Sequence, residues 1–201
     1  MRLRTLLLVP ILAASSPAAA IPPPPEQMSA NCESPTYASD VMVCGDPLLR
    51  ALDARMRDAW VTLDFAAVVA PDACVEAQDA WFRRRSLCAF SGRQSGCLED
   101  AYLERIAVLQ ALRLVASRPL RWAAAATCPD TPWGGATVRI RARATGALAV
   151  ENDDARVLAA ATPLRPGSAW TPYAAFAVEG PSIRLLPMSG PAITCTLGIG
   201  R

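Results

Sequence analysis

The residues able to carry out acid–base or nucleophilic chemistry in this chain of 201 residues include carboxylates, serines and cysteines. All 20 basic residues are arginine, because the sequence contains neither histidine nor lysine. The most common general base and the usual activators of a serine nucleophile are therefore missing. Paired carboxylates can hydrolyse glycosides, but no sequence pattern here brings two together as such a pair. We expect a protein that is not an enzyme, with no catalytic residue, no metal site and no cofactor.

The charged clusters occur in stretches with helical periodicity, and solvated helix faces are their simplest interpretation. An arginine run occupies positions 83–85. The acidic clusters are Asp53, Asp58 and Asp64, and then Glu99, Asp100 and Glu104.

The first 20 residues predict a secretory signal peptide. Arg2 and Arg4 precede a short apolar run, and the segment ends in three alanines. The run is too short for a transmembrane anchor, which needs about 20 apolar residues. Because Ile21 rather than a cysteine follows Ala20, no lipid anchor is expected either, and the sequence indicates a periplasmic or secreted protein. Cleavage would leave 18 arginines (20 − 2) against 18 acidic residues, so no charge excess for nucleic-acid binding remains.

Because we expect the protein to be exported, we expect structural disulfides among its seven cysteines. An oxidising compartment favours disulfides, whereas zinc sites usually also recruit histidine. Seven cysteines allow many connectivities, so the count alone leaves the pairing open, and one thiol must remain unpaired.

Three helices are predicted in the first half, after a proline-rich spacer at residues 21–31. Asp46 is placed to cap the first helix, with Pro47 in its first turn and apolar residues recurring as far as Leu63. The second helix is expected from about Asp72 to Cys88, and the third from about Ser95 to Arg113. Short connections between them predict a small three-helix bundle at residues 32–116. Trp60 and Trp81 are expected to anchor its core.

The second half changes to strand periodicity after an expected linker at residues 117–126. In "ATVRIRARA", apolar and arginine side chains alternate, as in a half-buried strand. Further short candidates follow near residues 147–150, 156–160, 174–178, 182–186 and 192–197, separated by turn residues. The expected fold class is α+β multidomain: a disulfide-bonded three-helix bundle followed by a small antiparallel β-barrel at residues 127–201.

The first half resembles the LprI-type lysozyme inhibitors. The resemblance is carried by "CGDPLLRALD", "QDAWFRRRSLC" and "CLEDAYLERIAVL", and it covers most of residues 32–116. It implies two disulfides, Cys32–Cys44 and Cys88–Cys97. The second pair also fits the short turn between two helices, which can bring two Cβ atoms within bonding range.

The second half resembles the MliC-type inhibitors of animal-type lysozyme. "TCPDTPWGGATVRIRARA" and "PAITCTLG" stand where that family's terminal strands are joined, which implies Cys128–Cys195 and leaves Cys74 unpaired. "LRPGSAWTPYAAFAVEG" is similar to the family's inhibitory loop and following strand. The resemblance implies that Ser168 hydrogen-bonds a lysozyme carboxylate, and that Glu179 stands where the family has a lysine. The lysozyme-contacting candidates are Arg165, Gly167, Ser168, Trp170 and Glu179.

These resemblances imply an exported binding protein whose partner is an animal-type lysozyme. A loop would enter the enzyme's carboxylate-lined cleft, and Glu179 would weaken binding because its charge has the wrong sign. The alternative interpretation is an envelope protein without inhibitory activity, which binds peptidoglycan or another envelope component through its helical part.

Overall fold

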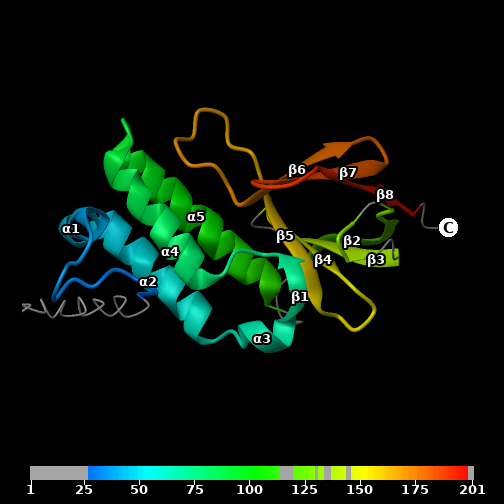
Figure 1. Ribbon diagram of the computed structural model, residues 1–201, viewed down its shortest axis with the longest axis horizontal. Helices are drawn as coiled ribbons and strands as arrows, with labels where there is room; N and C mark the ends of the chain where they lie inside the picture. The colour runs from blue at the N-terminus through cyan, green and yellow to red at the C-terminus, as the bar shows by residue number, and fades with distance from the viewer. Residues whose placement is uncertain (1–26, 114–119, 130, 134–136, 144–145, 199–201) are drawn as a thin grey trace, which may run out of the picture.

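The computed structural model describes residues 27–113, 120–129, 131–133, 137–143 and 146–198. The expected signal peptide and most of the expected spacer lie outside these residues. The described part has helices at one end and a β-barrel at the other (Figure 1).

The helical end contains a helix start that can be recognised from the sequence, at Asp46 and Pro47. Asp46 Oδ1 accepts hydrogen bonds from the backbone N–H groups of Leu48 and Leu49, at 2.8 and 3.3 Å, and Pro47 opens the helix, as predicted. The apolar stripe expected for this helix included Leu48, Leu52 and Met56; Leu52 and Met56 are buried, whereas Leu48 is exposed and Leu49 is buried instead. The helices are α1 (Ala38–Gly45), α2 (Pro47–Val61), α3 (Phe65–Val68), α4 (Gln78–Ser86), a 3-10 helix (Leu87–Phe90) and α5 (Gln94–Leu112).

The barrel is closed by seven strands in the order β5-β4-β3-β2-β8-β7-β6, with β6 pairing back onto β5. Six of its strands lie where the sequence predicts strands, whereas β2 begins inside the stretch expected to be a linker. The strands are β2 (Leu120–Thr127), β3 (Thr137–Arg143), β4 (Leu148–Glu151), β5 (Val157–Pro163), β6 (Ala174–Glu179), β7 (Ser182–Pro187) and β8 (Ile193–Leu197).

The expected fold class, a separate three-helix bundle followed by an antiparallel barrel, is wrong. An additional strand, β1 (Val69–Cys74), interrupts the helical part where the second helix was expected to begin, and it pairs in parallel with β5. The β5–β6 pair that closes the barrel is also parallel. The helices therefore do not form a bundle of their own before the barrel: a strand from among them belongs to the same sheet.

The helices and the barrel share a wall formed by β4 and β5. Leu148 and Val150 of β4 face the barrel interior, whereas Ala149 belongs to the core that contains the helices. Residues 148–151 are all buried, as are residues 157–162. Strands buried on both faces appear in a sequence as continuous apolar runs, and small alanine side chains allow α5 to approach closely.

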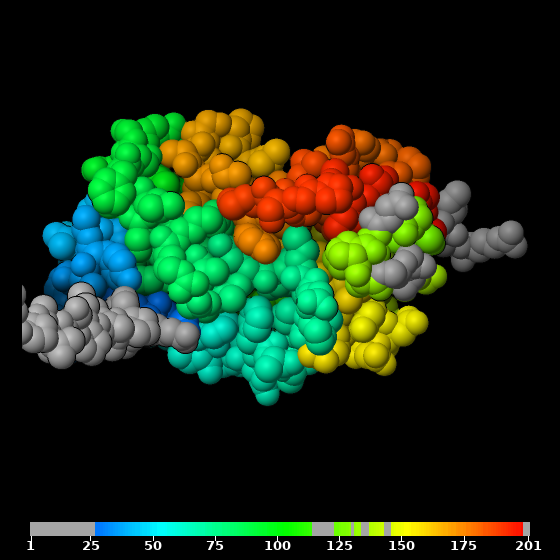
Figure 2. Space-filling view, in the orientation of Figure 1, coloured from blue at the N-terminus to red at the C-terminus, as the bar shows by residue number. Residues whose placement is uncertain are grey.

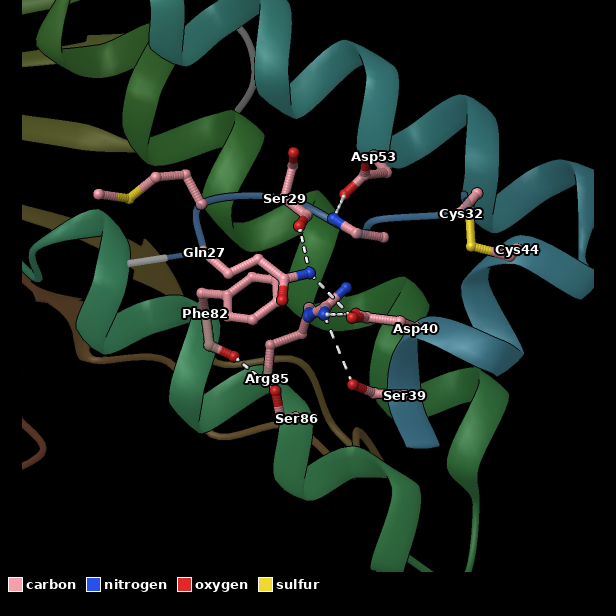
Figure 3. A network of polar contacts seen from close by, with 12 residues as sticks. Gln27, Ser29, Cys32, Ser39, Asp40, Cys44, Asp53, Phe82, Arg85 and Ser86 are labelled. Atoms are coloured by element: carbon pink, nitrogen blue, oxygen red, sulfur yellow. Dashed lines mark hydrogen bonds and ion pairs between the residues drawn. A yellow bond between two sulfur atoms is a disulfide. The ribbon is translucent and has the colours of Figure 1, made fainter. Parts of the chain in front are cut away.

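A buried polar network ties the N-terminal segment to the helices (Figure 3). Arg85 forms an ion pair with Asp40 at 2.7 Å, and neither side chain is exposed. Arg85 also donates to the hydroxyl of Tyr102, which donates to Asp53 at 2.8 Å. The backbone N–H of Ala30 completes the series by donating to Asp53. The arginine run was expected on a solvated face, yet Arg85 lies at the centre of this core.

Three disulfides join the pairs that the resemblances imply. They are Cys32–Cys44, Cys88–Cys97 and Cys128–Cys195. Cys128–Cys195 closes a long loop of the barrel, and such cross-links stabilise a small fold by restricting the unfolded chain. Cys74 is the unpaired cysteine; it lies half-buried in β1, and burial raises the pKa of its thiol. The disulfides fit folding in an oxidising compartment.

Candidate functional site

Four of the five candidate contact residues lie in the segment between β5 and β6, residues 164–173, which we call the β5–β6 loop. This loop rises from the barrel and lies beside the helices (Figure 1). Its tip is a tight turn in which the N–H of Ser168 donates to the carbonyl of Arg165 at 3.2 Å. Gly167 has a φ of 74° and follows Pro166, the arrangement that a type II turn requires. Arg165 and Ser168 are therefore held at the two ends of one turn.

Both ends of this turn bind a single carboxylate, that of Asp100 on α5. The hydroxyl of Ser168 donates to Asp100 Oδ2 at 2.5 Å. The guanidinium of Arg165 lies 3.2 Å from Asp100 Oδ1, so each carboxylate oxygen has one donor from the loop. The Ser168 oxygen in turn accepts the N–H of Trp170 at 3.0 Å, and the carbonyl oxygen of Trp170 lies 3.0 Å from the same hydroxyl. The turn is thus a carboxylate-binding element, and its carboxylate comes from the same chain.

The base of the loop is anchored by Arg84 of α4. Its guanidinium lies 3.8 Å from the ring centroid of Trp170, a cation–π arrangement, and donates to the carbonyl of Thr171 at 2.6 Å. Two further hydrogen bonds, at 2.8 and 2.6 Å, join it to both carboxylate oxygens of Glu76. Trp170 is buried by this contact. A single arginine therefore connects α4, the segment before it and the loop.

Glu104 lies one helical turn after Asp100, beneath the base of the loop. Its carboxylate accepts the backbone N–H of Tyr173, and burial raises its pKa to about 7. It lines a cavity of about 40 Å³ between α5 and the loop, together with Leu103, Ala107, Pro163, Trp170 and others. Among the buried side-chain atoms of the described residues, Glu104 Oε2 and Trp170 Nε1 have no hydrogen-bond partner. A cavity of this size has room for a few water molecules.

The fifth candidate, Glu179, lies apart from the other four. It ends β6, whereas the loop joins the beginning of β6 at Ala174. Five residues of extended chain separate these two positions, a distance of about 16 Å. Glu179 is exposed and lies 3.9 Å from Arg184 of the neighbouring strand. The structure therefore brings Arg165, Gly167, Ser168 and Trp170 together, and places Glu179 at the opposite end of a strand.

The loop's partners on the helices were assigned to solvated faces by the sequence interpretation. Of the arginine run, only Arg83 is largely exposed, and it pairs with Asp79 along the helix at 2.7 Å. The signal that could have located the site is the spacing of Asp100, Leu103, Glu104 and Ala107 on α5. Residues at these intervals lie on one face of the helix. Because Leu103 and Ala107 are apolar, they indicate that this face is also covered in the folded protein.

Comparisons with protein-family models, curated proteins and solved structures found no match to this chain. Within the described ranges, no helix has the length and apolar character needed to cross a membrane. The same residues contain no group of three or more cysteine, aspartate or glutamate side chains arranged to hold a metal ion. What the site offers chemically is a hydroxyl and a guanidinium directed at a carboxylate, with a tryptophan beside them.

Proposed function

We propose that this protein is an exported inhibitor of an animal-type lysozyme, and that the tip of the β5–β6 loop makes the inhibitory contact. The observation that carries the proposal is the pairing of Ser168 and Arg165 with the two oxygens of one carboxylate. Lysozymes hydrolyse their substrate with a pair of acidic side chains in a cleft. A hydroxyl and a guanidinium presented on a turn are the donors needed to bind such a side chain.

Two further features support a binding role rather than catalysis. The tip is ordered by its own turn hydrogen bond, which lowers the entropic cost of binding. The chain also has no histidine or lysine that could activate Ser168 as a nucleophile. The expected signal peptide and the disulfides support a protein that acts in the periplasm or outside the cell, where a lysozyme would be met.

The test is an inhibition assay with the chain lacking its expected signal peptide, an animal-type lysozyme and peptidoglycan as substrate. Ser168→Ala is expected to weaken inhibition about 5- to 30-fold, because one charge-assisted hydrogen bond is lost. Ser189→Ala is the matched control, since Ser189 is exposed in the turn before β8. A wild-type protein that leaves lysozyme activity unchanged at micromolar concentrations would refute the proposal. Retention on insoluble peptidoglycan in the same experiment would instead favour an envelope-binding protein.

A further inference from the structure

The tip of the β5–β6 loop is already bound to a carboxylate of its own chain, that of Asp100. The tip of the loop, residues 164–169, lies against α5 in the space-filling view, where the orange segment adjoins the green helix (Figure 2). Both of its charge-recognising donors are directed at Asp100. We propose that Asp100 acts as an internal competitor that keeps the tip closed, so that a partner's carboxylate must displace Asp100 to bind. This inference rests on the proposed function.

The tip and the base of the loop are held very differently. Within the described residues, the hydrogen bonds that join the tip to the helices all go to Asp100, and the other contacts of the Ser168 hydroxyl are with Trp170 of the same loop. The base is fixed by Arg84 and Glu104, and by the bond from the N–H of Met188 to the carbonyl of Tyr173 at 2.7 Å. Loss of the Asp100 contact would therefore release the tip and leave the base in place.

The contact with Asp100 is accessible enough to be exchanged. The side chain of Arg165 is 52% exposed and that of Asp100 is 20% exposed. Ion pairs at such positions contribute little to stability because water competes for both partners. Next to them, Leu164 is an exposed apolar side chain and the cavity of about 40 Å³ separates part of the tip from α5. An incoming carboxylate would replace one acceptor by another of the same chemistry, with no charge left unpaired on the loop.

Competition of this kind has a quantitative consequence. The apparent affinity of a partner is reduced by the fraction of molecules whose tip is open. If the tip is open in roughly one molecule in ten, removing Asp100 strengthens binding about tenfold. The hydroxyl of Ser168 then serves the partner alone, so Ser168→Ala costs more affinity in a variant without Asp100 than in the wild type.

The test compares Asp100→Ala with Glu99→Ala, which removes the same charge from the adjacent position on α5. No hydrogen bond or ion pair of the described residues joins Glu99 to the loop. Hydrogen exchange followed by mass spectrometry reports on the tip without any partner. Peptides covering residues 164–169 are expected to exchange several-fold faster in Asp100→Ala and at the wild-type rate in Glu99→Ala. Equal exchange in all three proteins would overturn the proposal.

Inhibition of lysozyme by the same proteins supplies the second measurement. Asp100→Ala is expected to inhibit about tenfold more strongly than wild type and Glu99→Ala equally strongly. A wild type that inhibits while Asp100→Ala is no stronger would overturn the competition. If none of the proteins inhibits, the proposed function is refuted, and the exchange rates alone decide whether Asp100 holds the tip. Addition of Ser168→Ala to both backgrounds completes a double-mutant cycle, and equal losses in the two would count against Asp100.

Discussion

Two of the arginine–aspartate pairs among the described residues look alike as chemistry and differ in their surroundings. Arg85 and Asp40 lie 2.7 Å apart and are both fully buried among the helices (Figure 3). Arg165 and Asp100 lie 3.2 Å apart at the edge of the β5–β6 loop, where the arginine side chain is about half exposed. The first pair connects helices of the core, and the second connects a loop to a helix.

The two pairs also differ in how many other groups their side chains contact. Arg85 also binds the hydroxyl of Tyr102 and lies 4.3 Å from the ring centroid of Phe82, and Asp40 accepts the amide of Gln27 at 2.8 Å. The side chain of Arg165 has the Asp100 contact alone among its hydrogen bonds within the described part of the chain. Removing one member of a buried pair leaves an uncompensated charge, whereas an exposed partner is taken over by water. The comparison teaches that the first pair is structural and the second can be exchanged.

Breaking the buried pair should give the largest effect. Asp40→Ala leaves the guanidinium of Arg85 in the core without its carboxylate, and we expect the free energy of unfolding to fall by about 3 to 5 kcal/mol. Urea denaturation monitored by circular dichroism measures the change. Asp79→Ala is the control, because it breaks the exposed Arg83–Asp79 pair and should cost less than about 0.5 kcal/mol. Similar losses in the two variants would contradict the role of burial.

Glu104 offers an intermediate case, a buried carboxyl at the base of the loop. Its pKa is raised from 4.5 to about 7, so the folded protein binds its proton more tightly than the unfolded chain does. Its contribution to stability is therefore greatest below about pH 4.5 and is lost as pH rises to 7. Glu104→Gln should remove this dependence and raise the free energy of unfolding at pH 8 by about 3 kcal/mol.

Denaturation of both proteins between pH 5 and pH 8 measures this difference. Glu99→Gln is the control on the same helix, and it should keep the pH dependence of the wild type. A Glu104→Gln protein that is no more stable than wild type at pH 8 would show that the carboxylate is stabilised by Arg84 and Arg105 despite its burial.

Breaking the exposed pair should change stability little. Arg165→Ala is expected to lower the free energy of unfolding by less than about 1 kcal/mol, because water replaces the guanidinium at Asp100. The same denaturation experiment measures it. A loss as large as that of Asp40→Ala would show that the loop contact is part of the core, and would remove the basis for exchange with a partner.

The smallest effect is expected at Glu179. Because Glu179 lies at the far end of β6 from the loop, Glu179→Lys should strengthen lysozyme inhibition by less than about 1 kcal/mol, through screened long-range attraction alone. Inhibition constants at low and at high salt measure this, and the gain should disappear at high salt. A gain that is larger and independent of salt would mean that the hairpin of β6 and β7 contacts the enzyme directly.

Local features of the fold could be predicted from the sequence, because their causes lie within a few residues. The cap of α2 depends on Asp46 and Pro47, and the turn at the loop tip depends on Pro166 and Gly167. Six barrel strands were predicted, β3 from its alternation and the others as short segments separated by turn residues. The cysteine pairs came from the family resemblances together with the short turn between two helices.

Only the tertiary structure decided which charges are buried and what they bind. Arg83, Arg84 and Arg85 are consecutive in sequence, yet one is exposed, one is stacked on the loop and one is enclosed by the core. Strand β1 forms by pairing with β5, and the local sequence from Val69 to Cys74 did not predict a strand there. Asp100 binds Ser168 across 68 residues of sequence. Capping and periodicity act between neighbours in the chain, whereas burial depends on which distant elements pack together, and so the carboxylate in the site became visible only in the folded protein.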